Sequence, residues 1–165
     1  MRDLEPPDSH FLNAARGWLG LGLPEEARSE LNQLSPEAQL HPAVLTVEWE
    51  RYAHLRDWTA ALRIADRLLA IDNSLPAGWI NRSYALHELR RTHEARTALL
   101  AALPRFPSVG VIHYNLACYA CHLGDLPEAR TWLRQAMAIE GREVILERAR
   151  TDADLDPIRH ELSGL

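Results

Sequence analysis

The sequence has no lysine, only two cysteines and no long apolar segment. All 18 basic residues are therefore arginines, and the larger number of acidic residues gives a formal net charge of -5. A negative chain repels phosphate groups, which argues against nucleic acid and anionic membrane surfaces as partners. No apolar run approaches the roughly 20 residues of a membrane span, so we expect no membrane insertion.

The N-terminus and the cysteines together favour a reduced, cytoplasmic setting. Residues 1–8 carry charges and prolines where a secretory leader has its apolar core. Cys118 and Cys121 are three residues apart in one predicted helix, where geometry rarely permits a disulfide. We therefore expect free thiols and a cytoplasmic location.

What the chain does contain is an internal repeat with a period of 34 residues. Four alanines in similar surroundings follow one another at this spacing: Ala27, Ala61, Ala95 and Ala129. A leucine stands six residues before each of them. The hydrophobic content of 47% supplies enough apolar surface for a packed core. A period of this length, held without insertion, predicts one pair of antiparallel helices in each repeat.

The expected helices alternate along the chain. The first helices of the pairs are predicted over residues 9–21, 43–55, 76–89 and 110–123, and the second helices over residues 24–34, 58–71, 92–104 and 126–140. Candidate N-caps are Asp8, Ser9, Asp57, Thr92 and Asp125.

The turn between the two helices of a pair differs among the repeats. Gly22 and Gly124 end two of the first helices, where a left-handed residue is favoured. Arg56 and Arg90 stand at the equivalent places in the other two repeats. A side chain in a left-handed turn costs on the order of 1 kcal/mol, so we predict a different shape for these two turns.

The repeat resembles the tetratricopeptide repeat (TPR) family. The four alanines match the TPR pattern, as do Gly22, Tyr52, Trp79, Pro107 and Gly124. The resemblance covers about residues 8–143 and implies an all-α solenoid of four helix-turn-helix repeats, approximately 8–41, 42–75, 76–109 and 110–143. It leaves residues 1–7 as an N-terminal extension and residues 142–165 as a C-terminal capping helix and tail. This tail looks like the closing segment of many bacterial TPR proteins.

The resemblance also implies that the first helices line a concave groove. The sixth position of the repeats carries Asn13, Val47, Asn81 and Asn115, which is similar to the asparagine ladders that hold peptide backbones in some TPR domains. With neighbouring groove positions added, the predicted binding residues are Asn13, Arg16, Glu50, Asn81, Tyr84, Tyr114, Asn115 and His122. Two alternatives remain open: the asparagines are merely tolerated and solvated, or the tyrosines pack between neighbouring helices.

The segment Cys118–His122 matches the Cys-x-x-Cys-His pattern of covalent haem attachment. A zinc site of Cys118, Cys121 and His122 with His54 or His87 is a second alternative. The pattern lies inside a helix whose other residues fit the repeat. We therefore expect neither haem nor metal, and no other cofactor.

The expected function is a scaffold or adaptor that binds a protein or peptide, as an extended segment or a partner helix, in the groove. No glycine-rich phosphate loop, nucleophile elbow or metalloprotease helix is present, so no enzymatic activity is expected. The alternative is a secretion-type TPR chaperone. Such chaperones usually carry about three repeats and a dimerising N-terminal extension, whereas this sequence has four and almost no extension.

Overall fold

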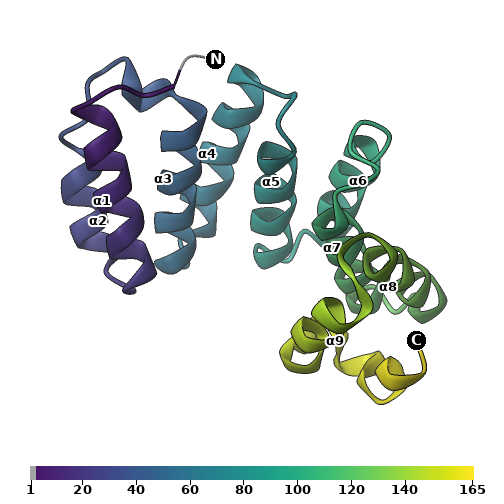
Figure 1. Cartoon of the computed structure of the whole chain (residues 1–165). Coiled ribbons are helices and arrows are strands. Elements are labelled where there is room, and N and C mark those ends of the chain that lie inside the picture. Colours follow the sequence, from purple (N-terminus) through teal and green to yellow (C-terminus); the bar gives the residue numbers. More distant parts are fainter. Residues whose placement is uncertain (1–2) are drawn as a thin grey trace. The chain divides into compact units, whose positions relative to one another are not determined.

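The computed structural model describes residues 3–165, except for the side chain of Ser163, and this part of the chain is helical without any strand (Figure 1). The α-helices are α1 (Asp8–Gly20), α2 (Pro24–Leu31), α3 (Pro42–His54), α4 (Trp58–Ile71), α5 (Pro76–Glu88), α6 (Thr92–Ala102), α7 (Gly110–His122), α8 (Leu126–Glu140) and α9 (Arg142–Thr151). Two 3-10 segments, η1 (Ala38–Leu40) and η2 (Ala153–Gly164), complete the order. The all-α prediction is confirmed. Among the described residues, no helix has the length and apolarity needed to span a bilayer.

The chain divides into two compact units, Met1–Ala85 and Leu86–Leu165. Within each unit the paired helices pack as the repeat predicts, with α1 on α2, α3 on α4, and α7 on α8. The four repeat alanines Ala27, Ala61, Ala95 and Ala129 are all completely buried. A side chain as small as alanine lets two helix backbones approach closely, so these positions set the packing inside each pair.

The 34-residue period reappears in the backbone hydrogen bonds of the turns. At each turn an amide N–H donates to the carbonyl oxygen five residues before it, in the pairs Leu23 to Trp18, Asp57 to Tyr52, Arg91 to Leu86, and Asp125 to Ala120. The prediction of two differently shaped turns is wrong. Arg56 and Arg90 have φ angles of 55° and 63°, in the same left-handed region as Gly22 and Gly124. The helix packing on either side therefore imposes one turn geometry despite the cost of a side chain there.

Two of the predicted N-caps are confirmed. The carboxylate of Asp57 accepts from the Ala60 amide at 2.9 Å, and that of Asp125 accepts from the Glu128 amide at 3.1 Å. Asp8, Ser9 and Thr92 are wrong as caps, because each lies inside its helix.

Asp8 instead ties the start of α1 to the segment after α2. Its carboxylate accepts from the Ser35 amide at 2.8 Å and from the Ser35 hydroxyl at 2.7 Å. These two hydrogen bonds hold the pKa of Asp8 below its ordinary value.

The C-terminal segment covers the last helix pair. Helix α9 packs against α8, and η2 packs against α7 and α9. Leu155 and Ile158 of η2 are completely buried, and Leu162 is nearly so. Arg130 of α8 adds a two-pronged ion pair to Glu161, with nitrogen–oxygen distances of 2.5 and 2.7 Å. Half of residues 142–165 is thus a 3-10 helix rather than the α-helix that the sequence predicts.

Candidate functional site

An open groove of about 430 Å³ lies between α1 and α3 in the first unit. Helix α1 contributes Arg16, Leu19 and Gly20, and helix α3 contributes Trp49, Glu50, Ala53 and His54. Apart from Trp49, these residues occupy the ninth, twelfth and thirteenth positions of the first two predicted repeats. Arg16 and Glu50 were both expected in the groove, and both are exposed. The groove thus combines one charge of each sign with an apolar floor.

Trp49 is the residue that the sequence analysis missed. Its equivalents at the 34-residue spacing are Ala15, Ser83 and Ala117, and all three of these small side chains are completely buried. An indole ring cannot fit the space that serves an alanine, and Trp49 is only partly buried. It lines the groove instead. Comparing the four residues at this position in the sequence would have singled it out.

An aromatic cluster adjoins the groove. Trp49 meets Tyr84 of α5 edge-on, with ring centroids 6.1 Å apart, and Trp58 of α4 lies 5.6 Å from the same tyrosine ring. Tyr84 remains 38% exposed. Large, partly exposed aromatic side chains held by their neighbours are typical anchors at protein interfaces.

Three buried donors in the first unit lack an acceptor among the described residues. They are the indole Nε1 of Trp49, the guanidinium Nε of Arg51 and the amide Nδ2 of Asn81. A buried donor left unpaired costs about 1–3 kcal/mol, and each can only be satisfied by an acceptor atom. Their chemistry is therefore complementary to carbonyl or carboxylate oxygens.

The remaining predicted groove residues divide between the two units. Asn13 is exposed on α1, whereas Asn81 on α5 is only 9% exposed. In the second unit, Asn115 is half-buried and His122 is exposed. Tyr114 is 3% exposed, and its hydroxyl donates to the Asp152 carboxylate at 2.8 Å. Tyr114 is therefore a packing residue, as one alternative proposed. It packs against the tail, however, and not between neighbouring first helices.

A polar cluster forms where η2 meets α7. Asp152 accepts hydrogen bonds from the hydroxyl of Tyr114 and, at 3.7 Å, from the thiol of Cys118. Asp154 contacts Nε2 of His87 at 3.1 Å. The His87 ring lies 5.0 Å from that of His122. Residues from the end of α5, from α7 and from the tail are thus gathered in one place.

The electrostatics of this cluster disfavour further negative charge. Burial raises the pKa of the Cys118 thiol, and the nearby carboxylates of Asp152 and Asp154 raise it further. Burial likewise raises the pKa of Tyr114. The hydrogen bond from His87 lowers the pKa of Asp154, so that this carboxyl group is ionised at neutral pH. The thiols stay protonated, and both cysteines are only 4% exposed, an environment that does not suit covalent haem attachment.

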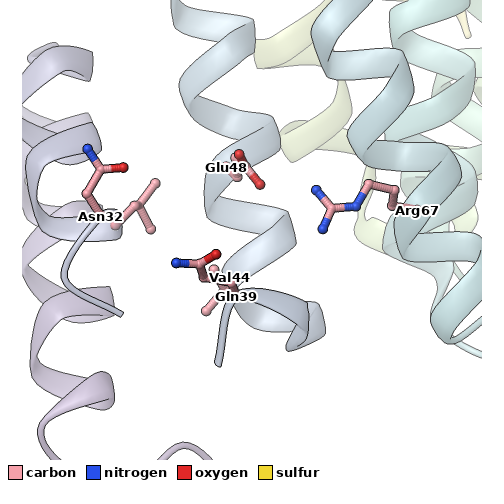
Figure 2. A pocket seen from close by; sticks show the side chains of 6 residues that line it. Asn32, Gln39, Val44, Glu48 and Arg67 are labelled. Carbon is pink, nitrogen blue, oxygen red and sulfur yellow. The ribbon is translucent and has the colours of Figure 1, made fainter. Parts of the chain in front are cut away.

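A second, smaller pocket of about 130 Å³ lies among α2, η1, α3 and α4. Figure 2 shows Glu48 of α3 and Arg67 of α4 extending into it from facing helices. Asn32 and Gln39 provide amides, and Leu31 and Val44 complete the lining. This pocket contains none of the residues that the sequence analysis selected.

Comparison with known structures identifies the fold as that of TPR proteins. A thermophilic TPR protein from Thermus thermophilus superimposes with a TM-score of 0.74 at 18% identity, over 95% of this chain and 95% of that chain. MamA from Desulfovibrio magneticus RS-1 superimposes with a TM-score of 0.70 at 16% identity, over 98% of this chain and 94% of that chain. Another crystal structure of MamA gives a TM-score of 0.70 at 13% identity, over 84% and 81% of the two chains. The sequence matches no protein-family model and no curated protein.

Proposed function

We propose that the chain is a non-catalytic protein-binding scaffold, and that the groove between α1 and α3 holds a segment of its partner. The observation that carries this proposal is the open groove itself, lined by repeat positions that the TPR resemblance assigns to ligand contact. Its volume of about 430 Å³ falls in the range of about 300–1,000 Å³ that is common for ligand pockets. Arg16 and Glu50 allow the groove to select its ligand by charge.

The second unit supports this proposal because its own tail provides an example of such binding. Cys118 and His122 occupy on α7 the ninth and thirteenth positions, which on α1 and α3 line the groove. On α7 these side chains meet the carboxylates of Asp152 and Asp154. A chain segment thus lies across this helix face and offers acceptor oxygens to it.

Of the three unpaired donors of the first unit, the indole of Trp49 belongs to a residue that lines the groove and favours the same kind of ligand. Trp49, Arg51 and Asn81 each have a buried donor without an acceptor among the described residues. A peptide supplies one carbonyl oxygen per residue, and an acidic side chain supplies two more. The amide nitrogen of Asn81 has no solvent exposure, so neighbouring side chains must move before a ligand reaches it. Asn13, which is exposed, needs no such movement.

Peptide-display selection on the purified full chain tests the proposal, with calorimetry on the selected peptides. Glu50→Arg places two like charges in the groove and should weaken the selected peptides at least about tenfold, a change of about 1.4 kcal/mol.

The matched control is Glu26→Arg, which makes the same charge change at an exposed position of α2 outside the groove. It should leave the affinities unchanged. Peptides that bind Glu50→Arg and Glu26→Arg as tightly as the wild type would locate the binding surface elsewhere. Circular dichroism of each complex then separates a helical ligand from an extended one.

A further inference from the structure

We infer that the second unit binds a divalent transition-metal ion of the zinc class through His87, His122 and Asp154. These residues come from the end of α5, the end of α7 and the start of η2. One potential ligand atom from each lies within 4.8 Å of the other two. This site is separate from the groove in the first unit and does not rest on the proposed function.

The ligand atoms are already close to the separations that a bound zinc ion requires, so the side chains need to move little on binding. Zinc bonds of about 2.0–2.1 Å in tetrahedral geometry separate two ligand atoms by about 3.3 Å. Nε2 of His87 and Oδ2 of Asp154 are already 3.1 Å apart. Two imidazoles that share one tetrahedral ion have ring centroids about 5 Å apart. The rings of His87 and His122 are 5.0 Å apart and nearly perpendicular, at 85°.

His87 is held as metal-bound histidines usually are. It is 6% exposed, and its Nδ1 lies 3.0 Å from the hydroxyl of the buried Thr92. Metal-bound histidines typically donate their outer ring N–H to such an acceptor, which fixes the ring and its tautomer. Metal binding requires the ring proton on Nδ1, so the hydrogen bond between Nε2 and the Asp154 carboxylate is then replaced by a cation held between these two acceptors.

The charge balance also favours a cation. Asp152 is adjacent to Asp154 and accepts from its backbone amide at 3.0 Å. Asp154 forms an ion pair with His87 and also interacts electrostatically with Arg90, while Arg148 stacks on the ring of Tyr114. A water molecule provides the fourth ligand. Because His122 is exposed, the ion can enter from solvent.

The ligand chemistry sets the metal class. Imidazole nitrogen suits zinc, cobalt, nickel and copper, whereas calcium and magnesium prefer sets of oxygen ligands. This proposal departs from the expectation from sequence that no metal binds. It also differs from the zinc alternative drawn from the Cys-x-x-Cys-His pattern, because Asp154 comes from the tail.

The test is a titration of the chelator-treated full chain with Co²⁺, followed through the visible absorption of tetrahedral cobalt. We expect one ion per chain, and we expect His122→Ala to weaken binding by more than about tenfold. His122 is exposed, so this variant should fold, which circular dichroism verifies. The control is His93→Ala, which removes an exposed histidine of α6 outside the cluster and should bind as the wild type does.

A second variant separates ligation from packing. Asp154→Asn keeps a hydrogen-bonding partner for His87 but loses the anionic ligand, so it should fold and bind Co²⁺ weakly. Zn²⁺ should raise the melting temperature of the wild type and of His93→Ala, but not that of the other two variants. Wild-type protein that takes up no Co²⁺, or that binds it no better than His122→Ala, would refute the site. If His93→Ala weakened Co²⁺ binding as much as His122→Ala, the metal would be bound by scattered surface histidines, and the proposed site would also be refuted.

Discussion

The same position of the repeat has different environments in the two units. At the ninth position, Arg16, Glu50 and Tyr84 are exposed in the first unit, whereas Cys118 in the second is only 4% exposed. The difference arises from the tail, in which η2 packs on α7 and the preceding residue, Asp152, contacts the cysteine thiol. The helix face that is open in the first unit is therefore occupied in the second unit by a segment of the same chain.

The hydrogen bonds follow the same division. Among the described residues, the buried donors without an acceptor are Trp49, Arg51 and Asn81, all of the first unit. In the second unit, Tyr114 and His87 have partners in the tail at 2.8 and 3.1 Å. The second unit therefore satisfies these polar groups within its own chain, whereas the first unit leaves three donors unpaired, and three sets of variants test this comparison.

The largest effect is expected from Leu155→Ala in the tail. Leu155 is completely buried, and truncating such a leucine costs about 2–5 kcal/mol of unfolding free energy. Urea unfolding followed by tryptophan fluorescence measures the change. Leu21→Ala is the control in the first unit, because Leu21 is 71% exposed and should change stability by no more than about 0.5 kcal/mol. Equal effects of the two variants would show that the tail does not hold the second unit together.

A smaller and opposite effect is expected at the turns. Arg56→Gly in the first unit and Arg90→Gly in the second should each stabilise the protein by about 1 kcal/mol, because glycine adopts the left-handed conformation without steric cost. The converse change is Gly22→Ala, at a φ of +74° and with open space around the added carbon, which should destabilise by a similar amount. Thermal unfolding measures all three. Destabilisation by both glycine variants would indicate that the arginine side chains make compensating contacts.

The smallest effect concerns acid stability. Asp154 of the second unit and Asp8 of the first both have a pKa below the ordinary value of 3.8. The folded state therefore binds fewer protons than the unfolded state, so the stabilisation is complete above the ordinary pKa and is lost as the pH falls through the lowered one. Asp154→Asn and Asp8→Asn should each reduce the fall in stability between about pH 5 and pH 3. A fall as steep as that of the wild type would show that the replaced carboxyl group is not responsible.

The helix pairs could be predicted from the sequence because their determinants are local. The buried alanines and the caps Asp57 and Asp125 act within one repeat, and the 34-residue period makes them visible. The shape of the turn at Arg56 was predicted wrongly because only the conformational preference of the residue was considered. The packing of two helices on either side of the turn outweighs a cost of about 1 kcal/mol.

The candidate sites were harder to predict because their contacts are long-range. The groove positions of Arg16 and Glu50 follow from the repeat, but the burial of Tyr114 depends on Asp152, which is 38 residues away. Thr92 was read as a helix cap, yet its hydroxyl contacts His87. The contact between His87 and Asp154 spans 67 residues and has no local signature.

Because the tail packs on α7 and is synthesised after it, this contact forms late in synthesis. Tyr114 and Asp152 are 38 residues apart, so a ribosome adding about 5–20 residues per second completes the pair about 2–8 s after the tyrosine is made. During that interval the face of α7 with Tyr114 and Cys118 lacks its cover, while every residue of α1 and α3 has already been made. The contacts that bury Tyr114 and Cys118 therefore form only at the end of synthesis, after the residues of the first unit.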